Sequence, residues 1–205
     1  MEKHFTLKDI ESLDTVKRRN LINSLGGFKS ANLIGTTDGK GNHNLAVFNS
    51  VVHIGANPPL MGFILRPHTV PRHTYENLKE IPWFTINHVH EGIIENAHQT
   101  AAKYDENISE FKATGLTPVF SKICKAPYVA ESQIRIGLEY VDEEKIRINN
   151  TILIIGKVHE IILPDDVLTK DYFVNAAKAN TVAVSGLDGY FSARPVKRLS
   201  FPRPG

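Results

Sequence analysis

Short apolar segments separated by turn residues dominate the chain from residue 31 onward. Apolar runs occupy residues 32–36, 44–52, 60–65, 82–89, 133–140 and 151–162. The pairs Asp38-Gly39 and Asn149-Asn150 lie where hairpin turns are expected, and Asn57-Pro58-Pro59 separates the second run from the third. Many strands with few helices predict an antiparallel barrel rather than alternating strand–helix units.

Helical periodicity is confined to short segments. Residues 14–25 carry Val16, Leu21, Ile22 and Leu25 at near-helical spacing, and Gly26-Gly27 follows as a stop signal. Residues 74–79 and 95–103 also favour short helices, and a further turn begins at 109–111. The segment 164–179 is expected to be helical near its end, over residues 171–177.

Composition indicates an ordinary globular protein. The chain has 205 residues, of which 41% are hydrophobic and 22% charged, and it contains no repeat or linker, so residues 1–205 are interpreted as one domain. The net charge of +2 is too small to indicate a nucleic-acid or membrane surface. No run approaches the roughly 20 apolar residues of a membrane span, and the N-terminus lacks an apolar signal core. A cytoplasmic protein is therefore expected.

Few residues suggest a metal or a tightly held dinucleotide. The lone Cys124 matches no zinc spacing and is interpreted as a buried, inert thiol. His88 and His90 share one face of an expected strand, but the sequence places no third ligand of suitable type, so no metal is expected. Neither GxGxxG nor a P-loop is present, so any dinucleotide is expected to bind transiently on another surface.

The clearest ligand signal follows the third apolar run. Directly before a helix start the chain carries a cluster of Arg66, His68, Thr69, Arg72, His73 and Thr74. Guanidinium forks, threonine hydroxyls and a helix N-terminus all suit a phosphate group. The same composition also fits a solvated loop with two ordinary surface arginines.

The order of these parts resembles the flavin reductase-like, FMN-binding split-barrel family, in particular its flavoredoxin-like branch. The segment Asn44-Leu45-Ala46-Val47-Phe48-Asn49-Ser50 is similar to the family's Asn-Leu-Ala-Pro-aromatic-Ser strand, with Val47 at the usual Pro and Asn49 at the usual Ser. Arg72-His73-Thr74 takes the place of a basic-Asp-Thr element, with His73 at the usual Asp. Later segments at 109–117, 126–132, 150–158, 189–191 and 201–204 follow the family order, so the resemblance spans residues 12–205.

One departure from the family lies upstream. Relatives often carry Pro-Arg-Pro where this chain has Phe28-Lys29-Ser30. Lys29 supplies a single point charge rather than a guanidinium fork, so the role of the family's arginine is not carried over to this position.

The resemblance implies a mainly β fold, an antiparallel Greek-key split barrel with peripheral helices, and a homodimer with FMN near the subunit interface. The residues it implies for cofactor binding are Ala46, Val47, Phe48, Asn49 and Ser50 along the flavin ring, Arg66, Thr69, Arg72, His73 and Thr74 around the phosphate, and Asn87, His88 and His98 nearby. Phe48 equally suits a plain core position, and His98 suits either the ring edge or the phosphate.

The implied reaction is hydride transfer from NAD(P)H to FMN. The cofactor carries that chemistry, so no catalytic side chain is expected. One alternative is a non-catalytic electron carrier similar to flavoredoxin, and another is a ligand-binding module that has lost turnover. A nicotinamide dinucleotide and an electron-accepting oxygenase are the further partners implied, with no nucleic acid and no membrane.

Overall fold

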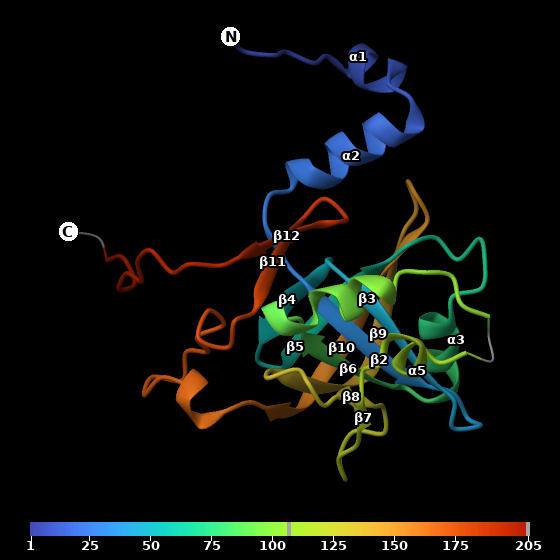
Figure 1. Ribbon diagram of the computed structural model, residues 1–205, viewed down its shortest axis with the longest axis vertical. Helices are drawn as coiled ribbons and strands as arrows, with labels where there is room; N and C mark the ends of the chain where they lie inside the picture. Colours follow the sequence, from blue (N-terminus) through green and yellow to red (C-terminus); the bar gives the residue numbers. More distant parts are fainter. Residues whose placement is uncertain (106–107, 204–205) are drawn as a thin grey trace.

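A seven-stranded antiparallel sheet forms the body of the molecule, in the order β3-β2-β6-β9-β10-β5-β4 (Figure 1). The computed structural model describes residues 1–105 and 108–203. A smaller sheet, β1-β11-β12, and the two-stranded β7-β8 lie outside the large sheet. Every pairing is antiparallel, which confirms the prediction of a mainly β, antiparallel fold.

The strands are β1 Lys29–Ser30, β2 Asn32–Thr37, β3 His43–Phe48, β4 Val51–Ala56, β5 Pro59–Leu65, β6 Trp83–His88, β7 Pro118–Val119, β8 Tyr128–Val129, β9 Arg135–Ile146, β10 Thr151–Ile162, β11 Val182–Ser185 and β12 Gly189–Ser192. The helices are α1 Leu7–Ser12, α2 Thr15–Leu25, α3 His73–Glu80, α4 Ile94–Gln99 and α5 Glu110–Thr114, with 3-10 turns at Glu91–Ile93 and Asp165–Val167. The expected hairpin turns at Asp38-Gly39 and Asn149-Asn150 connect β2 to β3 and β9 to β10.

One continuous segment supplies both edges of the large sheet. Its first half, β3, pairs with β2, and its second half, β4, pairs with β5. The expectation of a single strand over 44–52 was wrong, because the chain must bend at Asn49-Ser50 to change partners. Since the two edge strands are consecutive in the chain, the sheet curls toward a barrel.

Aromatic and aliphatic side chains fill the barrel interior. Phe63 and Phe84 are fully buried, and the Phe63 ring lies 4.9 Å from that of Phe48 and 5.4 Å from that of Phe84. The same cluster contains Ile34, Leu65, Leu78, Ile86, Ile136, Leu138, Ile152 and Ile154. Phe48 therefore lies partly in the core, as its alternative interpretation required.

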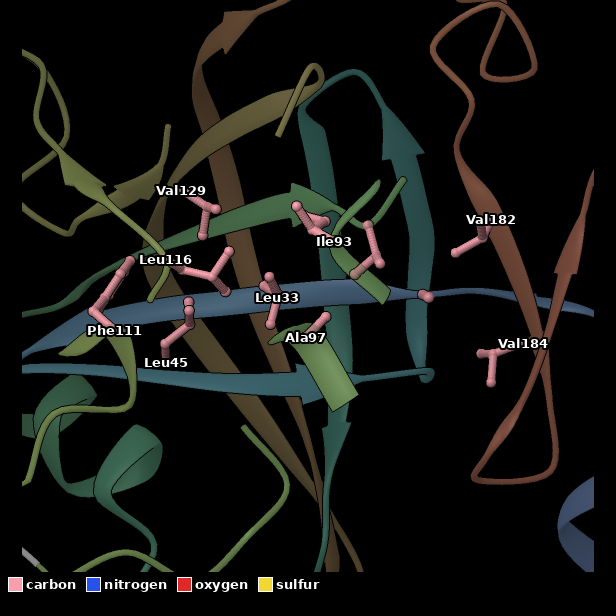
Figure 2. Packing of buried hydrophobic residues seen from close by; sticks show 11 residues of the cluster. Leu33, Leu45, Ile93, Ala97, Phe111, Leu116, Val129, Val182 and Val184 are labelled. Carbon is pink, nitrogen blue, oxygen red and sulfur yellow. The ribbon is translucent and has the colours of Figure 1, made fainter. Parts of the chain in front are cut away.

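A second apolar cluster covers the outer face of β2 and β3 (Figure 2). Leu33 and Leu45 point from these strands toward Ala97 of α4 and Phe111 of α5. Val182 and Val184 of β11 extend the cluster toward the small sheet. These contacts fix α4, α5 and the small sheet against the strand that carries the candidate flavin segment.

The first two helices project from this body (Figure 1). The expected helix over 14–25 is confirmed as α2, and the Asp14 side chain caps it by accepting from the N–H of Lys17. Helix α1 was not predicted from the sequence, although Thr6 and Asp9 form a capping box at its start. Neither helix has a buried residue. No helix in the described part of the chain is long and apolar enough to cross a membrane.

The helix expected over 171–177 was wrong. The hydroxyl of Thr169 accepts from the N–H of Phe173, and the Thr169 N–H donates to the Phe173 carbonyl. These bonds fold the segment into a turn with Tyr172 at a φ of 62°. Threonine side chains compete in this way with helical hydrogen bonding. The helix expected over 95–103 is shorter as α4, because the Thr100 hydroxyl donates to the Ala97 carbonyl at its end.

Candidate flavin site

The loop of residues 66–72, between β5 and α3, reaches from one end of β3 to the other. At its beginning, the Ser50 hydroxyl just after β3 donates to the carbonyl of Ile64 in β5 at 3.0 Å. At its end, the Asn44 amide of β3 donates to Thr74 Oγ1 in the first turn of α3 at 3.1 Å. The two bonds therefore join β3 and the residue pair that follows it to β5 and to the start of α3, which flank the loop.

The start of α3 offers several donors to an anion. Arg72 is the N-cap residue, and among the residues that the structure describes its buried Nε has no hydrogen-bond partner. Within the described residues, the main-chain N–H groups of His73 and Thr74 also have no acceptor, and neither Arg66 nor Arg72 forms an ion pair. Arg66 and Thr69 are exposed in the loop. Unpaired guanidinium and helix N-terminal N–H groups are the donors that phosphate sites use.

A carboxylate already occupies part of this helix end. Glu76 Oε1 accepts from the N–H of Arg72 at 3.3 Å and lies 3.2 Å from Nε2 of His68. The contact holds the loop against the first turn of α3. The donors left for a ligand are those of Arg66, Arg72, His73 and Thr74.

An open main-chain edge runs along β3. Its other side pairs with β2 through the register Leu33↔Val47 and Ile34↔Ala46. On the open side, the Leu45 N–H donates to Oε2 of Glu110 at 3.1 Å. Because outward-facing groups alternate along a strand, the N–H and C=O of Val47 also face that edge. Within residues 46–48 of β3, the main-chain N–H and C=O of Val47 are thus a donor and an acceptor that no strand in the described part of the chain uses.

Three further candidates lie toward the small sheet. Asn49 Nδ2 donates to the Gly186 carbonyl at 2.7 Å, and Nδ1 of His98 lies 3.2 Å from the hydroxyl of Tyr190. His88 Nδ1 lies 3.5 Å from Oγ1 of Thr181, just before β11. Burial lowers the pKa of His88 from 6.5 to about 4, so the ring is neutral at pH 7. His88 and His90 are held separately, since His90 Nε2 lies 3.0 Å from the Glu131 carbonyl.

The side chain of Asn87 forms its hydrogen bonds inside the fold. Its amide nitrogen donates to the Leu33 carbonyl at 3.1 Å and to Thr85 Oγ1 at 2.8 Å, and its oxygen accepts from the Val129 N–H at 3.0 Å. The residue is fully buried. With these bonds formed, its side chain has no free polar group directed at a ligand.

Glu110 is a site-lining residue that the sequence pattern did not single out. Its carboxyl is buried beside β3, and burial raises its pKa despite the hydrogen bond from Leu45. It borders a cavity of about 300 Å³ that Asn44, His73 and Asn77 also line. The only sequence signal was the Glu-Phe pair that begins α5, which does not show that the carboxyl lies against β3.

The comparisons agree with this architecture. A split-barrel protein from Shewanella frigidimarina NCIMB 400, named as a candidate flavin reductase, superposes with a TM-score of 0.94 at 46% identity, over 98% of this chain and 100% of the other. Nitrilotriacetate monooxygenase component B from Bacillus cereus gives a TM-score of 0.84 at 18% identity, covering 97% and 100% of the two chains. Flavoredoxin of Desulfovibrio vulgaris (Miyazaki F) gives 0.75 at 23% identity, covering 85% and 92%.

The fold is thus that of the split-barrel flavin reductases. The family model for the flavin reductase like domain matches residues 25–181. The chain belongs to the flavin reductase-like family, which confirms the resemblance seen in the sequence.

Proposed function

We propose that this protein binds FMN, with the phosphate at the start of α3 and the flavin ring along β3. The observation that carries the proposal is the buried Nε of Arg72 at the N-terminus of α3, which has no partner in residues 1–105 and 108–203. An Arg–phosphate contact would satisfy that donor, while the N–H groups of His73 and Thr74 would share the anion. The main-chain N–H and C=O of Val47 face outward from β3, so they could form hydrogen bonds with the coplanar polar atoms of an isoalloxazine ring.

The proposed activity is NAD(P)H-dependent flavin reduction. Bound FMN would supply the acceptor for a hydride from a nicotinamide dinucleotide. The chain's own part is to bind and orient, since proximity and alignment alone provide a large share of such a rate enhancement. His88 is neutral at pH 7 and half-buried at the end of β6, so it can help to exclude water without contributing a charge. No general acid or base is assigned.

The proposed assembly is a cytoplasmic homodimer with a flavin near the interface of the two copies. The reduced flavin would serve an electron-accepting partner, for which the likeness to a monooxygenase component suggests an oxygenase. Sedimentation at micromolar concentration tests the dimer. A monomer near 22.9 kDa that still holds FMN would refute it.

Titration with FMN, FAD and riboflavin tests the binding proposal. FMN is expected to bind most tightly, because it ends in a phosphate group that can reach the start of α3. Riboflavin has no phosphate, and FAD carries a further nucleotide beyond it. Equal affinity for riboflavin would contradict a phosphate site.

Anaerobic spectra of the FMN-loaded protein test the activity. Bleaching of the visible flavin band by NADH or NADPH supports the reductase. If both leave the flavin oxidised while FMN stays bound, the electron-carrier alternative replaces it.

A further inference from the structure

Four side chains meet where α3 packs against β9. Glu143 of β9 accepts from the Tyr75 hydroxyl at 2.9 Å, from the Tyr140 hydroxyl at 2.8 Å and from Lys79 Nζ at 2.8 Å. The Lys79 ammonium also lies 4.8 Å from the ring centre of Tyr75 and 4.6 Å from that of Tyr140. Glu143 is thus the acceptor that holds three donors together.

The protonation states in this cluster are well defined. Burial pushes the pKa of Glu143 up, but the hydrogen bonds from Lys79, Tyr140 and Tyr75 outweigh it and leave the pKa below its usual value. Glu143 is therefore ionised at neutral pH, and Lys79 balances its charge. The cluster orients α3 and adds no net charge beside it.

These contacts hold one face of α3, and different contacts hold another. Tyr75 and Lys79 are four residues apart and project from the same face of the helix toward Glu143. Thr74 and Asn77 bond instead to Asn44 and Thr36 of the β2–β3 hairpin. A helix of eight residues is marginal by itself in water, so these tertiary contacts set its rotation and tilt.

The same cluster reaches the loop that precedes α3. The Tyr75 ring lies 5.1 Å from the ring of His68, which is also 3.2 Å from the Glu76 carboxylate. His68 lies between Arg66 and Arg72, the two guanidinium groups of the candidate phosphate site. A continuous series of contacts therefore runs from Glu143 through Tyr75 to the loop.

We propose that Glu143 and Tyr75 are positioning residues for the phosphate end of the flavin site. They contact no ligand themselves, but they fix α3 and the loop of residues 66–72 so that Arg72, His73 and Thr74 converge on one anion. This inference rests on the proposed FMN function. It assigns a role to a strand, β9, that is separated from β3 in the sheet by β2 and β6.

The test compares Glu143→Ala with Glu139→Ala. Glu139 lies on the same strand and also has a hydrogen-bonded partner, His159 at 3.0 Å, but that pair does not touch α3. FMN and riboflavin affinities are measured for both variants and for the unaltered protein. For Glu143→Ala we expect FMN affinity to fall about three- to tenfold while riboflavin affinity stays unchanged. Glu139→Ala is expected to change neither.

The outcomes separate the two proposals. If the unaltered protein prefers FMN and Glu143→Ala keeps the same preference as Glu139→Ala, the positioning role is wrong and the phosphate site stands. If the unaltered protein shows no preference for FMN over riboflavin, the phosphate site is wrong, and the positioning role with it. Should Glu143→Ala not fold, Tyr75→Phe carries the same test, since it removes a single hydroxyl and keeps the ring against His68.

Discussion

The side-chain amide of Asn44 donates to the hydroxyl oxygen of Thr74 at 3.1 Å, across 30 positions of sequence. Both residues are buried. The bond joins the first part of β3 to the first turn of α3. The strand and the helix end that are proposed to bind the flavin ring and its phosphate are therefore held at a fixed spacing, as a ligand with both groups requires.

Arg72→Ala is expected to weaken FMN binding about ten- to a hundredfold, because a charge-assisted bond to phosphate contributes on the order of 1.5–3 kcal/mol. Titration by flavin fluorescence measures the change. Arg19→Ala serves as the control, since Arg19 is an exposed residue of α2. An unchanged FMN affinity in a folded Arg72→Ala protein would place the phosphate elsewhere.

Asn87→Leu is expected to destabilise the protein rather than to act on flavin binding directly. It removes three buried hydrogen bonds and leaves the Val129 N–H and the Leu33 carbonyl without the amide. The expected loss in free energy of unfolding is about 2–4 kcal/mol, as measured by urea denaturation. Asn20→Leu, at an exposed position of α2, should change it little. A large fall in FMN affinity with full stability would show that Asn87 does face the ligand.

His88 makes stability depend on pH. Its folded-state pKa of about 4 lies below the ordinary 6.5, so the unfolded chain takes up a proton more readily. Stability should be unaffected by this group above about pH 6.5 and should fall as the pH drops toward 4, by at most about 3 kcal/mol. His88→Gln should reduce that slope in denaturation curves between pH 4 and 7, whereas the exposed His53→Gln should preserve it. Equal slopes for all three proteins would refute the assignment.

Gly35→Ala is expected to destabilise the sheet. A Cβ at this position of β2 would lie 2.3 Å from the main-chain oxygen of Pro127 and 2.7 Å from Thr85 Oγ1. Such overpacking costs about 1–3 kcal/mol, which a thermal or urea melt detects. Gly55→Ala is the matched control, since its Cβ would meet nothing closer than 3.5 Å. If both variants unfold alike, the close approach of Pro127 to β2 is wrong.

Much of the fold could be predicted because local pattern and burial agree. The runs at 32–36, 60–65 and 151–162 became β2, β5 and β10, where apolar side chains cover a shared core. The break at Asn49-Ser50 could not be predicted, because it depends on two partner strands that are distant in sequence. The helix expected near Tyr172 failed because one threonine hydroxyl supplied a local alternative.

The sequence predicted which types of residue form the candidate site. It did not predict which of them lie next to one another in the fold. Arg72 and Thr74 were found because a basic, hydroxylated cluster preceded a helix. The roles of Glu110 and Glu143 depend on contacts across 65 and 68 positions of sequence, to Leu45 and Tyr75. Pairings at that separation leave no local signature in a single chain.

The position of β10 between β9 and β5 also has a consequence for synthesis of the protein. β5 needs β10 as its second neighbour, and β9 needs it too, yet β10 begins only at Thr151. A nascent chain that stops short of Thr151 therefore presents two unpaired strand edges, which invite pairing with other chains. The sheet can close into a barrel only after most of the polypeptide has been made, as in other folds dominated by contacts between residues distant in sequence. C-terminal truncations within residues 151–162 should accordingly yield aggregates rather than a smaller folded barrel.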